Sequence, residues 1–100
     1  MPGRTRTDAQ SRLPAPELSD LRNVGSATVA DLARLGIRTV RDLATQDAFE
    51  MYERLCRITR KRHDLCVIDV FLSAVDQARG GKARAWWHYT PQRKRRMITR

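Results

Sequence analysis

The chain has 100 residues, 41% of them hydrophobic, which is enough for one compact core and too little for a second domain. It contains no apolar run of about 18 residues, and its polar beginning lacks the apolar centre of a signal peptide, so we expect a cytoplasmic protein without membrane contact. The formal net charge of +9 predicts attraction to polyanions.

The positive charge is concentrated at the C-terminal end. Residues 17–81 hold ten basic and ten acidic side chains, so this part of the chain is neutral. The remaining residues, 82–100, hold seven basic and no acidic side chains. We therefore predict a basic C-terminal arm, residues 91–100, that binds nucleic acid, and a solvated tail that only raises solubility is the alternative.

The N-terminal part begins without a hydrophobic period. Residues 1–15 combine prolines and a glycine with scattered arginines, so we predict a disordered arm. Residues 16–22 are expected to form one or two helical turns, followed by a sharp turn over residues 23–25. A helix begins at Ser26, and Gly36 stands where a helix takes a left-handed C-terminal residue.

Two capping pairs then predict two further helices. Thr39 and Asp42 resemble a capping box before a short helix that ends near Thr45. Asp47 and Glu50 precede the most regular helical stripe of the sequence. That stripe consists of Ala48, Met51, Tyr52, Leu55 and Cys56.

The next predicted helix, residues 65–78, is hydrophobic on every side but one. Asp64 is its expected cap, and Gly80 with Gly81 ends it. Its polar side chains span only about 100 degrees of the helix surface, so protein must cover the other faces. This helix is therefore placed at the centre of the core. Its polar residues are Asp69, Ser73, Asp76 and Gln77.

An aromatic and basic segment follows the two glycines. We expect at least one of the two tryptophans in residues 86–89 to pack against the helix of residues 65–78, with stacking on bases as the alternative. A last short helix, residues 92–97, is expected to be marginal alone because its four consecutive cations repel one another. No strand-like alternation occurs, so the sequence predicts an all-α compact bundle of about five short helices over residues 16–90.

Metal binding and catalysis find little support in the sequence. Cys56 and Cys66 lie in apolar helical patterns, so we expect reduced thiols in the core. A metal set formed with His63 and His88 is the alternative, although the spacing lacks the paired short knuckles of common zinc sites. Neither histidine accompanies a patterned nucleophile, and no phosphate-binding or dinucleotide-binding loop occurs. We expect a non-enzymatic protein without metal, cofactor or small-molecule substrate.

Residues 21–32 resemble a helix-hairpin-helix motif, in which a turn built on two glycine-like positions joins two short helices. Asn23 takes the first of these positions and tolerates a left-handed backbone, and Gly25 takes the second, which needs close backbone approach. Main-chain N–H groups of such a hairpin point at a phosphate. The candidate nucleic-acid-binding residues are Arg22, Asn23, Val24, Gly25, Ser26, Ala27, Arg93, Lys94, Arg95 and Arg96.

Together with the hairpin, four later segments resemble the small bacterial pathogenicity-locus family over roughly residues 18–89; these segments are residues 36–43, 52–56, 63–71 and 86–87. Members of that family are often labelled mitomycin-resistance or helix-hairpin-helix proteins, and its first half is similar to the C-terminal domain of the competence regulator TfoX. The resemblance implies a DNA-binding type of fold. We therefore predict sequence-tolerant DNA binding through the hairpin and the arm. The alternative is a protein-interaction or regulatory module of the TfoX C-terminal type, with an acidic protein surface as its partner.

Overall fold

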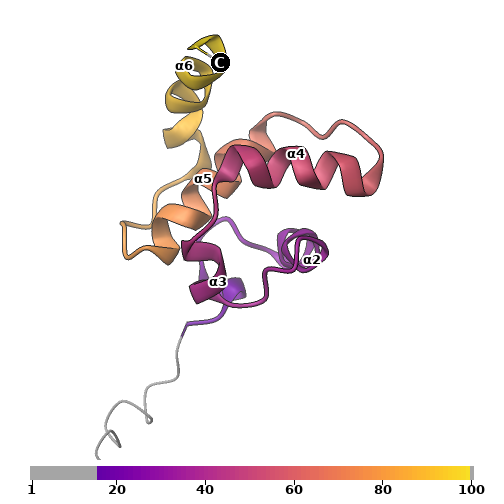
Figure 1. Ribbon diagram of the computed structural model, residues 1–100. Helices are drawn as coiled ribbons and strands as arrows, with labels where there is room; N and C mark the ends of the chain where they lie inside the picture. Colours follow the sequence, from indigo (N-terminus) through magenta and orange to yellow (C-terminus); the bar gives the residue numbers. More distant parts are fainter. Residues whose placement is uncertain (1–15, 100) are drawn as a thin grey trace, which may run out of the picture.

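The computed structural model describes residues 16–99, and the elements of this part of the chain are all helical (Figure 1). The predicted all-α fold is confirmed, and the last helix is longer than the predicted residues 92–97. The predicted disordered arm, residues 1–15, lies outside the described residues. In chain order the elements are the 3-10 helix η1 (Leu18–Asp20), α2 (Ser26–Arg34), α3 (Val40–Ala44), α4 (Ala48–Thr59), α5 (Cys66–Ala78), the 3-10 helix η2 (Trp86–Tyr89) and α6 (Thr90–Thr99).

Left-handed residues stand before and after α2, as the sequence predicts. Asn23 has φ 71° in the turn that precedes the helix, and Gly36 has φ 79° after its end. The N–H of Gly36 donates to the carbonyl of Ala33 at 3.0 Å, and the N–H of Ile37 donates to that of Leu32 at 2.9 Å. These two bonds form a Schellman cap, which turns the chain sharply from α2 toward α3.

Side-chain caps start α3 and α4. The hydroxyl of Thr39 accepts a hydrogen bond from the N–H of Asp42 at 3.0 Å. The Asp42 carboxylate reaches back to the N–H of Arg38 at 3.3 Å, one residue before the position that a full capping box requires. The Asp47 carboxylate accepts from the N–H of Phe49 at 2.8 Å. The predicted starts of both helices are therefore confirmed.

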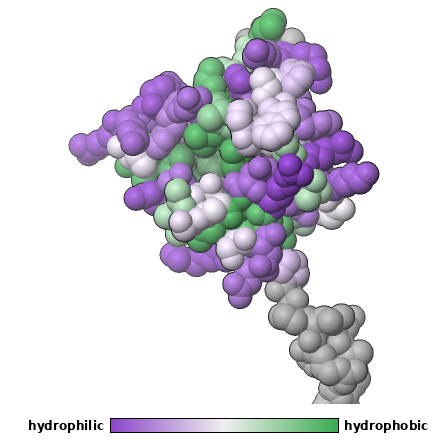
Figure 2. All heavy atoms as spheres, turned by 180° about the vertical axis from the view of Figure 1, so that it is seen from behind, coloured by the Kyte–Doolittle hydropathy of each residue, from purple (hydrophilic) through white to green (hydrophobic). Residues whose placement is uncertain are grey.

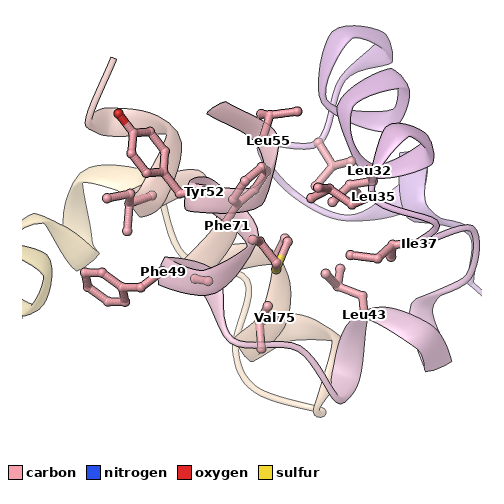
Figure 3. Close-up of a cluster of buried hydrophobic side chains, with 14 of the residues drawn as sticks. Leu32, Leu35, Ile37, Leu43, Phe49, Tyr52, Leu55, Phe71 and Val75 are labelled. Atoms are coloured by element: carbon pink, nitrogen blue, oxygen red, sulfur yellow. The ribbon is translucent and has the colours of Figure 1, made fainter. Parts of the chain in front are cut away.

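The core forms where α3 and α4 pack against α5 and where α2 packs against α4 (Figure 3). Seen from behind, hydrophilic side chains surround the periphery and hydrophobic ones gather in the middle (Figure 2). Because α5 packs against α3, α4, η2 and α6, its predicted central place is confirmed. The largest fully buried hydrophobic side chains are Leu32, Ile37, Leu43, Met51, Tyr52, Leu55, Ile68 and Phe71.

The polar side of α5 is covered as well, which the sequence pattern does not predict. Asp69 and Ser73 both have an exposed fraction of 0%. Burial of polar groups is tolerated only where they find hydrogen-bond partners, so other parts of the chain must supply those partners. The polar stripe of buried Asp69 and Ser73 and half-buried Gln77 positions the candidate site described below.

The two cysteines lie in different surroundings. Cys56 is buried and Cys66 is half-buried, and both are free thiols. Burial, and then the hydrogen bond with Asp64, raise the pKa of the Cys66 thiol, which keeps it protonated at neutral pH. Within residues 16–98, no three His, Cys, Asp or Glu side chains are grouped so that they could hold a metal ion. Among the described helices, none combines the length and apolar character that crossing a bilayer requires.

Candidate nucleic-acid interface

The hairpin, residues 22–27, is fastened to α5 by the side-chain amide of Gln77. The N–H of Arg22 donates to Oε1 of Gln77 at 2.9 Å, and Nε2 of Gln77 donates to the carbonyl oxygen of Arg22 at 3.0 Å. The side-chain amide of Gln77 thus satisfies both the N–H and the carbonyl group of Arg22. This pair fixes the point at which the chain enters the turn, while the Arg22 side chain remains exposed.

The next two residues of the hairpin face the protein. The Asn23 side chain donates from Nδ2 to the Ser73 hydroxyl at 3.2 Å and to the carbonyl oxygen of Arg84 at 2.9 Å. Val24 is buried in the core. Of the hairpin residues predicted to bind nucleic acid, Asn23 and Val24 therefore hold the hairpin in place. Those that remain exposed are Arg22, Gly25, Ser26 and Ala27.

The exposed side of the hairpin is the uncapped start of α2. Gly25 is the N-cap residue, and no side chain accepts a hydrogen bond from the first turn. Its backbone is extended, with φ −91° and ψ −172°, so the conformation does not require glycine. A Cβ atom at this position would meet no heavy atom within 4 Å. Neither backbone strain nor packing requires glycine here, where it serves as an N-cap residue and leaves the surface open to the approach of a ligand.

Cations reach the hairpin from a distant part of the chain. Residues 26–32 contain no lysine or arginine. Residues 80–85 connect α5 to η2, and the hydrogen bond from Asn23 to the carbonyl of Arg84 places this connection beside the hairpin. Lys82 and Arg84 on the connection are exposed. With Arg22 included, the hairpin and the connection joined to it carry three exposed cations.

Comparisons with known proteins identify the family of the chain. Residues 11–95 match the model of the family described as pathogenicity locus, Cdd1. The chain belongs to this pathogenicity-locus family. The mitomycin resistance protein McrB of Streptomyces lavendulae is 46% identical over 79 residues, which cover 79% of this chain and 75% of that protein. No solved structure shows significant similarity to the chain.

In this pathogenicity-locus protein the described residues of the predicted basic arm lie in the helix α6, and two of its arginines form ion pairs with carboxylates of the protein. Nε of Arg93 lies 2.7 Å from Oδ1 of Asp69, and the Thr90 hydroxyl donates to Oδ2 of the same carboxylate at 2.7 Å. The Arg93 side chain has an exposed fraction of 11%. This arginine therefore belongs to a buried ion pair, where it is screened from an external phosphate.

Farther along α6, Arg96 is also in contact with the body of the protein. Its Nη2 lies 3.0 Å from the Asp47 carboxylate, and its guanidinium stacks over the Phe49 ring at 4.2 Å from the ring centre. Lys94 and Arg95 are exposed. Since α6 extends from the body away from α2 (Figure 1), these two cations are not gathered around the hairpin.

Tyr89 is the aromatic residue of η2 that the protein buries. Its hydroxyl donates to the Asp76 carboxylate at 2.6 Å. Burial, and then this hydrogen bond, raise the pKa of Tyr89 to about 12. Trp86 is half-buried, and Trp87 is exposed by 62% with its ring edge-on to that of Trp86.

Sequence reasoning missed Lys82 and Arg84 as residues of the hairpin region. Their charges belong to the C-terminal basic run, so the sequence associates them with Arg93 to Arg96. No local pattern indicates that the segment after Gly81 returns to Asn23. The sequence feature that could have indicated this return is the polar stripe of α5. Where protein covers such a stripe, its polar groups need hydrogen-bond partners from elsewhere in the chain.

Proposed function

We propose that this pathogenicity-locus protein binds nucleic acid, double-stranded DNA foremost, without sequence preference and without catalysing a reaction. The observation that carries the proposal is the open hairpin surface at Gly25, where an added Cβ atom would have no heavy atom within 4 Å. The uncapped first turn of α2 adjoins it. Main-chain N–H groups and the positive end of a helix dipole suit a phosphate oxygen.

Sequence tolerance follows from the kind of contacts that the surface offers. Main-chain N–H groups and the cations Arg22, Lys82 and Arg84 bind phosphate oxygens, which every nucleotide carries. Base recognition in the major groove usually needs a helix or strand that inserts side chains into it. The first turn of α2 presents only the small side chains of Ser26 and Ala27. The surface is therefore suited to hold a backbone rather than to read bases.

The experiment that tests this proposal blocks the hairpin without unfolding it. Gly25→Val places a branched side chain on the open surface, and we expect DNA affinity to fall by about tenfold or more, the equivalent of about 1.4 kcal/mol or more. Gly25→Ser is a second variant whose hydroxyl can cap α2 and occupy its N–H groups. It should bind DNA more weakly while the melting temperature stays equal or rises.

The matched control is Gly36→Ala at the other end of α2. Gly36 has φ +79°, where a side chain is strained, so this variant should unfold more easily by about 1 kcal/mol. Below its melting temperature it should bind DNA as the unaltered protein does. Folded Gly25→Val and Gly25→Ser proteins with undiminished affinity would show that the hairpin is only a connection between helices.

An acidic protein surface is the second candidate partner, favoured by Trp87. A tryptophan exposed by 62% close to the cations Lys82 and Arg84 has the composition of an interface anchor. If protein is the partner, Trp87→Ala should abolish complex formation and Gly25→Val should leave it intact. The opposite order of effects is expected for DNA.

A role in mitomycin resistance is a further proposal that comes from the name of McrB. We expect deletion of the encoding gene to lower survival on mitomycin. The unaltered protein should restore survival, and Gly25→Val should not if resistance depends on the hairpin. Restoration by both proteins would separate resistance from the surface described here.

A further inference from the structure

We propose that Lys82 and Arg84 are phosphate-binding residues of the hairpin region, and that Asn23 is the positioning residue that holds them there. The proposal rests on the nucleic-acid binding proposed above and adds to it the side chains that contact the phosphate. It also assigns different roles to two parts of the C-terminal basic run.

A three-membered hydrogen-bond cluster joins the hairpin to the connection of residues 80–85. Asn23 donates to the Ser73 hydroxyl at 3.2 Å and to the Arg84 carbonyl at 2.9 Å, and the Ser73 hydroxyl donates to the same carbonyl at 3.0 Å. Ser73 is fully buried on the rigid helix α5. The cluster therefore fixes the backbone of Arg84 next to the turn instead of leaving it to a mobile loop.

The connection leaves α5 in a turn that directs it over the end of the helix. The N–H of Gly81 donates to the carbonyl of Asp76 at 2.8 Å. A Cβ atom at Gly81 would lie 2.5 Å from the Asp76 carboxylate, so only glycine fits this close approach. This turn starts the return of the chain toward Asn23, where the Arg84 backbone meets the hairpin, and Lys82 precedes Arg84 by two residues.

The charged groups of Arg22, Lys82 and Arg84 are exposed and available to an external anion. In the part of the chain that the structure describes, no hydrogen bond or ion pair engages the charged groups of Arg22, Lys82 or Arg84. Asp76, the acidic residue at the start of the connection, accepts a hydrogen bond from the Tyr89 hydroxyl and forms no ion pair with Lys82 or Arg84. Exposed cations on two segments that a hydrogen bond joins, and without ion-pair partners, attract a phosphate group.

Asparagine at position 23 does more than adopt the turn conformation. Glycine would adopt the φ of 71° without strain, so the turn conformation does not require the side-chain amide of Asn23. The amide supplies the donor that reaches the Arg84 carbonyl. Asn23→Gly should therefore keep the turn and remove the direct bond between the hairpin and the connection, while the Ser73 hydroxyl still holds the Arg84 carbonyl on α5.

The salt dependence of duplex DNA binding tests the assignment of the cations. Each lost phosphate contact should make the slope of log affinity against log salt concentration shallower by about 0.9. We expect this change for Lys82→Gln and for Arg84→Gln, and about twice the change for the double variant. The matched control is Lys94→Gln, an exposed lysine of the same basic run on α6, which should leave the slope unchanged. A shallower slope for Lys94→Gln alone would overturn the assignment.

The positioning role of Asn23 has its own test in a double-mutant cycle. Arg84→Gln should weaken DNA binding less in an Asn23→Gly background than in the unaltered chain, because the connection there has lost its direct bond to the hairpin. If Asn23 only stabilised the fold, Arg84→Gln would weaken binding by the same factor in both backgrounds. Circular dichroism of each variant confirms that the comparison is made between folded proteins.

A titration with inorganic phosphate separates the failure of this inference from failure of the proposed function. We expect phosphate to shift the NMR signals of the Arg84 Nε–H group and the Ser26 amide, and to shift the Arg84 signal less in Asn23→Gly. If duplex DNA does not bind but phosphate produces these shifts, the anion site stands and DNA is the wrong partner. If DNA binds while the Arg84 and Lys82 variants match the unaltered protein, the inference is wrong and the function stands.

Discussion

The C-terminal basic residues fall into two regions that differ in their surroundings. Lys82 and Arg84 lie on the connection before η2, where the described structure shows no carboxylate paired with either side chain. Arg93 and Arg96 lie on α6 and pair with Asp69 and with a second carboxylate on the α4 cap. Arginine is always charged in both regions, so the difference lies in which carboxylates the fold brings near each cation.

This difference changes what each charge can do. A guanidinium that is already paired with a buried carboxylate cannot bind a phosphate unless the pair separates, and separation exposes a desolvated charge. An exposed cation without a partner loses only water and mobile counterions when it binds. We therefore expect α6 to contribute mainly to stability and the connection to contribute mainly to binding.

The largest expected effect is on the α6 side of this comparison. Asp69→Ala leaves Arg93 in a largely buried position without its carboxylate and removes the acceptor of the Thr90 hydroxyl. Breaking one half of a buried ion pair should lower the free energy of unfolding by about 3–5 kcal/mol, measured by urea denaturation. Arg84→Gln is the matched control, which should change it by less than about 0.5 kcal/mol. A loss below about 1 kcal/mol for Asp69→Ala would mean that α6 is not held by this pair.

Tyr89 tests the contact between η2 and α5, because its hydroxyl on η2 donates to Asp76 on α5. Tyr89→Phe removes the hydrogen bond to the charged Asp76 and should cost about 1.5–3 kcal/mol of unfolding free energy. If Asp76 finds no replacement partner, the loss will lie at the upper end of that range. A loss near zero would show that water satisfies this carboxylate equally well.

The raised pKa of Tyr89 also predicts a pH dependence. The folded protein holds the phenol proton up to a pKa of about 12, whereas the unfolded chain releases it near the ordinary value of 10.0. The folded state therefore binds more protons between these values, so the contribution of Tyr89 to stability should be constant below about pH 10 and fall from there toward pH 12. Chemical denaturation across this range checks the prediction, and Tyr89→Phe should show a weaker decline.

Asp47 allows the N-cap of α4 to be separated from the ion pair with Arg96. Asp47→Asn keeps a capping oxygen and should cost no more than about 0.5–1 kcal/mol, because the pair is half-exposed. Asp47→Ala removes the cap too and should cost about 1 kcal/mol more. Equal losses in urea denaturation would mean that the cap contributes nothing.

The same residue predicts a loss of stability in acid. Partial burial acts to raise the pKa of Asp47, but hydrogen bonds from Arg96 and from the first turn of α4 outweigh it and hold the pKa below 3.8. The contribution of this carboxylate is complete above its unfolded pKa and disappears as the pH falls through the folded value. Asp47→Asn should therefore reduce the sensitivity of the melting temperature to pH below about 4.

The smallest effect on stability is expected for Trp87. Its side chain is exposed by 62%, so Trp87→Ala should change the free energy of unfolding by less than about 0.5 kcal/mol. A larger loss would show that the two tryptophans act together as part of the core. Single-stranded DNA binding should weaken in this variant if the ring stacks on bases.

The sequence predicted those features that depend on residues close together in the chain. The left-handed residues Asn23 and Gly36 and the cap at Asp47 are signalled by neighbours within one helical turn. The stripe on α5 was found, but helical periodicity does not tell whether water or protein covers a polar face. Tertiary contacts answer that question, and they also decide that Arg93 is buried and Arg84 is not.

The cluster of Asn23, Ser73 and Arg84 has a consequence for the growing chain on the ribosome. It joins residues that are 50 and 61 positions apart, and each end must be present before it can form. Contacts of such long range form only after the intervening chain is available. The hairpin residues are synthesised before Arg84, so the bond between Asn23 and the connection can form only when the last fifth of the chain is present. Premature termination before Arg84 would therefore yield proteins that carry the complete motif without the assembled surface.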